Sequence, residues 1–225
     1  MDKKNIVIFG SGVHAKVIFH SIIKNKNYKF LGFVDYKNKT KIIINYNKTN
    51  YKIISDFNKL DELKKIKNLH GVIGIGSNFS RLDTYNLIMK IKLKVKWEKI
   101  IFKSANFSNN VKIGEGSVIM GNVYLNNETS IGSHCIINSG SIIEHDNIFN
   151  NFSSTGPGVT TGGNVKVGDL SHLGIGSTVL NGKKISSNTI IGGGSLVNKN
   201  CSSFSVYYGV PAKKKSGRRY NKKYL

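Results

Sequence analysis

A bulky apolar residue recurs at every sixth position along the second half of the chain. Fourteen of the 16 positions in this series are apolar, whereas a hydrophobic content of 39% would place only about six there by chance. Smaller residues follow the bulky ones by four positions, and only Asn147 and Lys183 fall outside this second class. Neither an α-helix nor a simple strand has a six-residue period. The bulky series is Phe107, Ile113, Ile119, Leu125, Ile131, Ile137, Ile143, Phe149, Thr155, Thr161, Val167, Leu173, Val179, Ile185, Ile191 and Val197.

Each six-residue unit predicts one flat side of a triangular coil, with a short strand that turns its bulky residue inward. Three sides make one coil, and coils stack at roughly 4.8 Å, so the series predicts a solenoid of about five coils. Gly or Asn directly follows many bulky positions, as in Gly114 and Asn126. We expect these residues to turn the corners in left-handed backbone conformations, which they tolerate.

The residues before the solenoid have a different pattern, in which apolar runs alternate with glycine turns and amphipathic stretches. Such alternation predicts a small Rossmann-like parallel α/β sheet. The expected strands are 5–9, 30–34, 42–44 and 71–75, and the expected helices are 15–24, 61–67 and 79–90. The chain therefore divides into a small α/β domain (1–98), a solenoid domain (99–205) and a basic C-terminal tail (206–225).

The first glycine turn carries the spacing of a dinucleotide-binding fingerprint. Gly10, Gly12 and Ala15 are followed by Asp35 twenty residues after Ala15, so a nicotinamide-dependent oxidoreductase is one hypothesis. A complete dinucleotide domain needs more strands than the sequence offers before residue 98. A nucleotide half-site fits better, because amides at a helix N-terminus suit a phosphate and Asp35 can accept from a ribose or a base.

The regular repeat degrades around His145, which is flanked by Glu144 and Asp146 and faces outward. A neighbouring carboxylate can orient an imidazole and stabilise its protonated form, as a general base requires. Gly163 lies 18 residues further on, so the next coil presents bare backbone beside the ring, and its N–H can face a developing oxyanion. The other histidines considered are expected to be exposed and idle: His20, His70, His134 and His172.

The net charge of the chain bears on which macromolecules it could bind. The formal charge is +22, with 34 Lys and Arg against 12 Asp and Glu, so nucleic acid and membrane surfaces come into question. The lysines are scattered throughout, which favours a compositional drift, and we expect neither partner.

Cys135 and Cys201 lie too far apart in the repeat for a disulfide and are expected to fill the core. We expect a cytoplasmic protein, with no signal sequence, no membrane span and no metal site.

Several motifs together resemble a known family. They are Gly-x-Gly-x-His-Ala-Lys at 10–16, Glu-His-Asp at 144–146, Gly-Asn-Val-Lys-Val-Gly at 163–168, Gly-Gly-Gly at 192–194 and Gly-Val-Pro-Ala-Lys at 209–213. This combination resembles the sugar acetyltransferases of the bacillosamine and perosamine pathways, including the sialic acid O-acetyltransferase type. The resemblance implies a left-handed parallel β-helix of hexapeptide repeats, acetyl-CoA as co-substrate and a homotrimer.

The resemblance also implies roles for individual residues. His145 would be the general base, Asp146 its orienting partner and Gly163 the oxyanion donor. Ser154 stands where many relatives carry a second histidine, and Val13 where some carry glycine. Acetyl-CoA would contact Ser154, Gly163, Ile175, Gly193, Val210 and Pro211. The nucleotide-sugar would contact Gly10, Ser11, Gly12, His14, Asp35, Tyr36, Lys37, Gly76, Ser77 and Asn78.

The leading hypothesis is an acetyl-CoA-dependent N-acetyltransferase that acts on the 4-amino group of a nucleotide-linked 4-amino-4,6-dideoxy sugar, with UDP or dTDP as the nucleotide. Two alternatives remain open on the same fold. One is O-acetylation of a sugar hydroxyl of the sialic acid type, because the histidine chemistry is indifferent to the nucleophile. The other is a non-catalytic trimeric binding or scaffold protein.

Overall fold

The computed structural model describes residues 3–36 and 41–220. It divides into two compact units, one comprising Met1–Gly76 with Ser80–Ile100 and the other Ser77–Phe79 with Ile101–Leu225. None of the helices in the described residues is long and apolar enough to cross a membrane.

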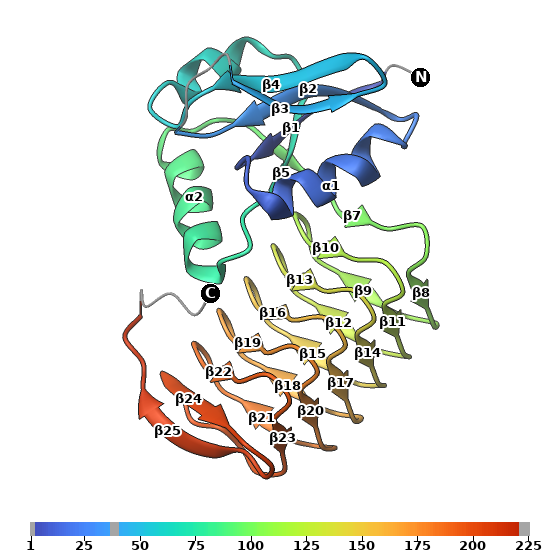
Figure 1. Ribbon diagram of the computed structural model, residues 1–225, viewed down its shortest axis with the longest axis vertical. Helices are drawn as coiled ribbons and strands as arrows, with labels where there is room; N and C mark the ends of the chain where they lie inside the picture. Colours follow the sequence, from blue (N-terminus) through green and yellow to red (C-terminus); the bar gives the residue numbers. More distant parts are fainter. Residues whose placement is uncertain (1–2, 37–40, 221–225) are drawn as a thin grey trace. The chain divides into compact units, whose positions relative to one another are not determined.

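The first unit is a six-stranded mixed sheet with the order β3-β4-β2-β1-β5-β6 (Figure 1). Strands β4, β2, β1, β5 and β6 run parallel, whereas β3 is antiparallel to β4. The elements are β1 (Lys4–Phe9), α1 (Val13–Ile23), β2 (Tyr28–Val34), β3 (Ile42–Tyr46), β4 (Thr49–Ser55), the 3-10 helix η1 (Leu60–Lys65), β5 (Leu69–Ile73), α2 (Asn78–Lys90) and β6 (Lys96–Trp97).

Apolar side chains alternate between the two faces of this sheet along its central strands, and both faces are covered. Val7 and Phe9 on β1 point to the face that packs with Leu60, Leu63 and Ile88. Intervening strand residues face α1, which buries Ala15, Ile18, Phe19 and Ile22. The Phe19 ring lies 5.1 Å from that of Phe30 and 4.8 Å from that of Tyr51. A sheet buried on both sides explains why its central strands read as continuous apolar runs.

The sequence predicted the parallel centre of this sheet but not its edges. Strands β4 and β6 were not expected, and β3 joins β4 in a hairpin instead of extending the parallel order. The segment expected to be a helix near 61–67 forms the 3-10 helix η1. Two strands of five and seven residues with mixed polarity give a weak alternation signal, which explains why the hairpin was missed.

The Glu98 carboxylate contacts side chains at the start of three parallel strands, β1, β2 and β5. Its carboxylate accepts hydrogen bonds from Tyr28 (2.7 Å) and Lys4 (2.9 Å), and it lies 2.6 Å from Nδ1 of His70. Burial by itself would raise the pKa of Glu98, but these hydrogen bonds outweigh burial and lower it. His70 was expected to be idle, and that expectation is wrong, because the ring is 7% exposed and paired with Glu98.

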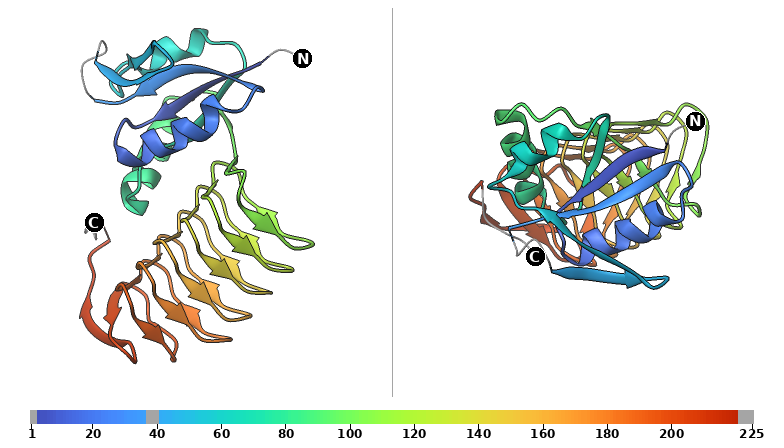
Figure 2. Two further views of the ribbon diagram at one scale, coloured as in Figure 1. Left: turned by 45° about the vertical axis from the view of Figure 1, so that its right-hand side comes forward. Right: turned by 90° about the horizontal axis from the view of Figure 1, so that it is seen from above.

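The second unit is a left-handed parallel β-helix, in which strands 18 residues apart pair in parallel. Figure 2 shows the coils stacked one upon the next. Its first sheet contains β7 (Ile100–Ile101), β10 (Val118–Ile119), β13 (Ile136–Ile137), β16 (Ser154–Thr155), β19 (His172–Leu173) and β22 (Ile190–Ile191). The second contains β8 (Asn106–Phe107), β11 (Tyr124–Leu125), β14 (Ile142–Ile143), β17 (Thr160–Thr161), β20 (Thr178–Val179) and β23 (Leu196–Val197). The third contains β9 (Lys112–Ile113), β12 (Ser130–Ile131), β15 (Ile148–Phe149), β18 (Lys166–Val167) and β21 (Lys184–Ile185).

The bulky series fills the solenoid as predicted, with every member from Ile119 to Val197 at most 2% exposed. The first two members differ, since Phe107 is 39% exposed and Ile113 is partly exposed. They belong to the first full coil, where no earlier coil of the repeat covers them. In the coil of Phe149, the two threonines Thr155 and Thr161 replace bulky apolar residues. Phe149 is among the largest fully buried side chains and offsets part of their smaller volume.

The expected role of the corner glycines is wrong. Left-handed residues lie three positions after the bulky residue, not one, as at Asn110, Gly140 and Asp146. The glycines directly after bulky positions are needed for another reason. A Cβ built on Gly114 would lie 2.5 Å from Ser133 N, and one on Gly168 would lie 2.5 Å from Ser187 N. The next coil therefore passes too close for any side chain.

The C-terminal segment contains a hairpin. Strand β24 (Ser205–Tyr208) continues the first solenoid sheet beside β22, and β25 (Lys213–Gly217) pairs antiparallel with β24. The segment expected to be a basic tail thus places Lys213 and Lys214 on an ordered edge strand. Lysine at a strand edge discourages further strand pairing.

The close approach of coils predicts the effect of a small substitution. Gly168→Ala should lower the free energy of unfolding by about 1–3 kcal/mol, because backbone atoms of Ser187 must move to admit the methyl group. Gly140→Asn is the matched control, since Gly140 has φ of +68° and no atom within 4 Å of a built Cβ. It should change stability by less than about 0.5 kcal/mol. Denaturant unfolding measures both, and equal midpoints for Gly168→Ala and the wild type would contradict the close-packing argument.

Candidate functional site

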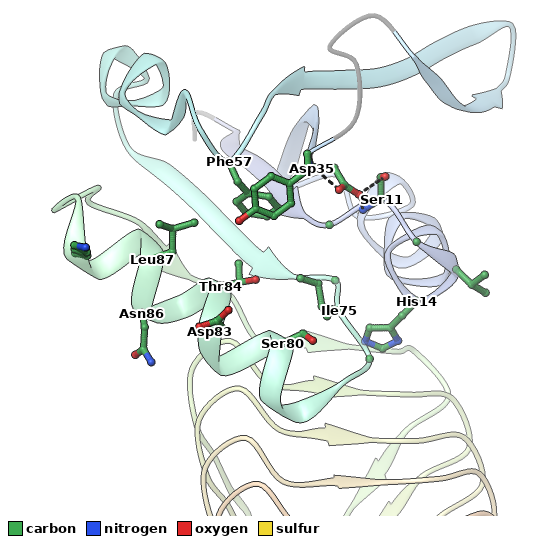
Figure 3. Close-up of a pocket in the computed structure, with 17 residues that line it drawn as sticks. Ser11, His14, Asp35, Phe57, Ile75, Ser80, Asp83, Thr84, Asn86 and Leu87 are labelled. Atoms are coloured by element: carbon green, nitrogen blue, oxygen red, sulfur yellow. Dashed lines mark hydrogen bonds between the residues drawn. The ribbon is translucent and has the colours of Figure 1, made fainter. Parts of the chain in front are cut away.

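A cavity of about 690 Å³ in the first unit gathers many of the residues predicted to bind nucleotide-sugar. Figure 3 shows Ser11, Asp35, Phe57 and His14 around it, with residues of α2 on the opposite side. The predicted residues that line it are Gly10, Ser11, Gly12, His14, Asp35, Tyr36 and Gly76.

The glycine turn after β1 forms one wall of this cavity. Gly10 has φ of +104°, and a Cβ on it would lie 2.9 Å from Ile75, so only glycine fits. Gly12 precedes α1, whose N-terminus has no side-chain cap and no acidic residue in its first turn. Uncapped N–H groups at a helix N-terminus attract anions, and a phosphate is the usual occupant of such a turn.

Asp35 holds the glycine turn to the end of β2. Its Oδ2 accepts from the Ser11 amide at 2.8 Å and from the Ser11 hydroxyl at 2.5 Å, while Oδ1 accepts from the Tyr36 amide at 2.8 Å. A carboxylate has about four acceptor positions, so three are occupied within the turn. Asp35 therefore shapes the wall and keeps limited capacity to accept from a ligand.

His14 carries an unused polar atom at the cavity. Its Nε2 is buried and has no hydrogen-bond partner among the described residues. Burial, and secondarily the positive charge of Arg81, lowers the pKa of His14 from 6.5 to about 4. Arg81 is itself fixed, because it donates to the carbonyls of Ile75 at 3.0 Å and Gly76 at 2.9 Å. Near neutral pH the imidazole of His14 is therefore uncharged, and its Nε2 is an unused polar atom of a residue that lines the cavity.

Neither the α2 side of the cavity nor the contact of Phe57 with Tyr36 was predicted from the sequence. Tyr36 lies against Phe57, with ring centroids 4.8 Å apart, and Phe57 was not singled out. The spacing of the α2 residues is that of one helix face, which could have indicated them. These residues are Ser80, Asp83, Thr84, Asn86, Leu87 and Lys90.

Two of the predicted residues do not line the cavity. Ser77 and Asn78 group with the solenoid unit, where the Asn78 amide donates to the carbonyls of Ser171 at 3.0 Å and Leu170 at 3.3 Å. Lys37 lies outside the described residues. Their assignment to nucleotide-sugar binding stays a prediction.

The solenoid brings His145, Asp146 and Gly163 together at the corner between its second and third sheets. Nδ1 of His145 lies 2.8 Å from Oδ2 of Asp146, and both side chains are more than half exposed. Asp146 has φ of +57°. A Cβ on Gly163 would lie 2.6 Å from Nε2 of His145, so a larger residue there would displace this ring. When Asp146 accepts from Nδ1–H, Nε2 is the nitrogen free to take a proton.

Apart from Gly163, the residues predicted to bind acetyl-CoA lie away from the His145 corner. Ile175 and Gly193 occupy successive turns at the corner between the first and second sheets, and a Cβ on Gly193 would lie 3.0 Å from Ile175. Ile175 is 63% exposed and Val210 is 72% exposed. Pro211 follows Val210 between strands β24 and β25.

Ser154 lies on a strand of the first sheet, and its hydroxyl is 2.8 Å from Nδ1 of His172 on the next coil. His172 was expected to be idle and exposed, which is wrong. His134 is also not idle, since it is 2% exposed and stacks on Phe152 at 5.0 Å. Within the described residues, no cluster of His, Cys, Asp or Glu has the form of a metal site.

Two known protein families match separate parts of the chain. Residues 5–88 match the PglD N-terminal domain, and residues 110–145 match the bacterial transferase hexapeptide repeats. The predicted resemblance to the sugar acetyltransferases of the bacillosamine and perosamine pathways is confirmed.

Solved structures match over almost the whole chain. A perosamine N-acetyltransferase from Caulobacter crescentus, in complex with CoA and GDP-perosamine, is 29% identical with a TM-score of 0.82. A variant of this enzyme with a single histidine replaced by asparagine gives a TM-score of 0.86 at 28% identity. Both alignments cover 94% of this chain and 97% of the other. The acetyltransferase domain of PglB from Neisseria gonorrhoeae, in complex with acetyl coenzyme A, shares the fold at 22% identity, with a TM-score of 0.84 over 95% of this chain and 100% of that domain.

The environment of His14 predicts its titration. The ring should stay neutral in the folded protein down to about pH 4. Because the unfolded chain takes up this proton near pH 6.5, the folded state should lose stability as the pH falls from 6.5 towards 4. NMR titration of the histidine ring protons measures the value, and His14→Gln identifies the resonance by its loss. A His14 signal that titrates near pH 6.5 would contradict the prediction.

Proposed function

We propose that the protein is an acetyl-CoA-dependent N-acetyltransferase whose acceptor is the 4-amino group of a nucleotide-linked 4-amino-4,6-dideoxy sugar. The observation that carries the proposal is the corner where His145, paired with Asp146, meets the bare backbone of Gly163. It places a base beside a backbone amide, with residue types that the repeat alone does not require. The Caulobacter complexes with CoA and GDP-perosamine support the substrate class.

The chemistry follows from this corner. Nε2 of His145 takes a proton from the sugar amine as its nitrogen attacks the thioester carbonyl of acetyl-CoA. Asp146 stabilises the imidazolium, and the Gly163 N–H donates to the oxyanion of the tetrahedral intermediate. The intermediate collapses to the amide, and coenzyme A leaves as a thiolate that is then protonated. A positioned general base contributes about 10² to 10⁴ in rate, and one oxyanion donor about 10² to 10³.

The cavity of the first unit suits the nucleotide end of the acceptor. The α1 N-terminus offers N–H groups to a phosphate, and His14 Nε2 offers one further polar contact. Tyr36, with Phe57 beside it, provides an aromatic surface for a base. A UDP- or dTDP-linked sugar is the prediction from the sequence, and a GDP-linked sugar is the alternative supported by the Caulobacter structures.

The positions on the solenoid also support a homotrimer. His145 lies at the corner between the second and third sheets, whereas Ile175 and Gly193 lie at the corner between the first and second. One coil cannot bring its own two corners together. A second copy can supply the donor-binding corner beside His145, and the exposed Ile142 (43%) and Ile148 (41%) that flank His145 suit such an interface.

Activity is tested by thiol release from acetyl-CoA with UDP-, dTDP- and GDP-linked amino sugars. We expect turnover with at least one of them, and His145→Asn should lower kcat by about 10² to 10⁴ with the trimer retained in size-exclusion chromatography. His20→Asn is the matched control and should keep wild-type kcat, because His20 is exposed on α1. Acetylation of a hydroxyl sugar with no turnover of any amine would instead indicate the O-acetyltransferase. No turnover with any acceptor would remove the proposal.

Asp35 provides a separate test of the acceptor site. Asp35→Asn replaces one carboxylate oxygen with an NH2 group, so the Ser11 and Tyr36 donors can no longer all be accepted and the glycine turn should loosen. We expect KM for the nucleotide-sugar to rise about tenfold, which corresponds to about 1.4 kcal/mol, while KM for acetyl-CoA stays the same. Asp61→Asn makes the same charge change at an exposed residue of η1 and should leave both constants unaltered. Equal KM values for the Asp35 variant and the wild type would argue against nucleotide binding in this cavity.

A further inference from the structure

Asn147 occupies a core position that the repeat otherwise gives to small residues. It is fully buried, with Thr129 one coil before it and Val165 one coil after it in the same column. A polar amide inside a solenoid core is costly unless its atoms are paired. Its presence two residues after His145 therefore needs a local reason.

The amide of Asn147 joins two coils. Its Nδ2 lies 2.5 Å from the carbonyl oxygen of Glu144, 3.3 Å from that of His145 and 2.9 Å from that of Gly162. Since all three partners are acceptors, the nitrogen of the amide must face them. The Oδ1 atom is buried and has no donor among the described residues.

Other residues at equivalent positions make only part of this pattern. Ser117 and Ser171 donate across to the next coil, to the carbonyls of Gly132 at 2.7 Å and Ser186 at 2.8 Å. A hydroxyl has one proton and can serve one such partner at a time, whereas an amide has two. Asn147 can therefore hold the coil of His145 and the coil of Gly163 simultaneously.

The bond to Gly162 holds the orientation of the Gly163 amide. The Gly162 carbonyl and the Gly163 N–H belong to one trans peptide, so they point in opposite directions. The equivalent carbonyls of Gly132 and Ser186 also face core donors, so the repeat turns this carbonyl inward and the N–H outward, and Asn147 holds the peptide in that orientation. Within the described part of the chain, no hydrogen bond of the Gly163 N–H to a backbone carbonyl is found.

This peptide has little stiffness of its own, because it lies between two glycines. Neither can be replaced cheaply. A Cβ on Gly162 would collide with Asn181, and one on Gly163 would collide with the His145 ring. Backbone hydrogen bonds hold the groups on either side, from the Gly162 N–H to the Val179 carbonyl at 2.8 Å and from the Gly182 N–H to the Gly163 carbonyl at 2.9 Å. The Gly162–Gly163 peptide between them is the one that Asn147 restrains.

We infer that Asn147 is a positioning residue, which holds the Gly163 N–H and the backbone of His145 in the orientation that acetyl transfer requires. The inference rests on the proposed function, in which His145 is the base and Gly163 the oxyanion donor. Asn147 itself touches no substrate. Its contribution should appear in kcat, because the oxyanion exists only along the reaction path.

Asn147→Val and Asn147→Ser test the inference. The valine variant repeats the residue found at Val165 in this column and removes both the three polar contacts and the unpaired Oδ1. We expect an equal or higher Tm, an intact trimer, a kcat lowered 10- to 100-fold, and KM values within twofold of wild type. The serine variant keeps one proton and should fall between the two in kcat. Ser117→Ala removes a similar bond to the next coil away from His145 and should keep wild-type kcat.

A crystal structure of Asn147→Val supplies a readout independent of activity. We expect the Gly162–Gly163 peptide to leave its wild-type orientation. A wild-type peptide orientation together with a kcat within twofold of wild type would overturn the inference, and so would a wild-type kcat in Asn147→Ser if the valine variant does not fold. If the wild type acetylates no acceptor, the proposed function fails. The peptide orientation in the valine structure then still decides whether Asn147 holds this peptide.

Discussion

The stacking of coils 18 residues apart is the constraint on which the solenoid and its candidate site both depend. Parallel pairing places residue i directly against residue i+18, at roughly 4.8 Å between strands. The same rule that stacks Ile143 on Thr161 in the core sets His145 beside Gly163 at the corner. The site therefore needs no special loop, because its geometry is a property of the repeat. Only the identities of the residues at that corner are exceptional.

The exceptional residues near this corner lower the stability of the fold, and in return they hold the atoms of the candidate site in place. A buried, unpaired Oδ1 such as that of Asn147 costs about 1–3 kcal/mol, and a serine or valine at this place would avoid it. Thr155 and Thr161 replace bulky apolar residues in the adjacent strands, and the larger Phe149 in the same coil offsets only part of the lost volume. Thr155 also accepts from the Asn138 amide at 2.8 Å. This part of the core is less apolar than the repeat permits, which is consistent with a functional site at the adjacent corner of the solenoid.

The sequence was most informative where one physical rule acted alone. The bulky positions were predicted because burial inside a coil selects for them directly, and only the end coil departs, at Phe107. The role of the corner glycines was not predicted, because two different requirements select glycine. A left-handed turn selects it at Gly140, and the close approach of the next coil selects it at Gly168. Sequence alone cannot separate these requirements, since both appear as glycine at a fixed position in the repeat.

The candidate site was predictable to a similar limit. His145, Asp146 and Gly163 followed from the repeat, because the 18-residue spacing fixes their proximity. The α2 wall of the cavity was missed, because polar residues such as Asp83 and Thr84 on one helix face look like an ordinary solvated surface. Asn147 was recognised as a departure from the small-residue class, but its hydrogen bonds depend on which carbonyls of two coils converge on one side chain. That convergence is a three-dimensional property, and only the structure assigns it a role.

The separation of the two solenoid corners explains why one protomer is insufficient for the proposed reaction. A triangular coil keeps its corners apart, since its three sides are rigid strands around a filled core. A base at one corner and a donor-binding turn at another can meet only across an interface between copies. The side chains around such an interface need not be polar, which agrees with the exposure of Ile142 and Ile148 beside His145. In the proposed trimer the regular repeat would supply the same set of corners in each copy, and assembly would place different corners of neighbouring copies side by side.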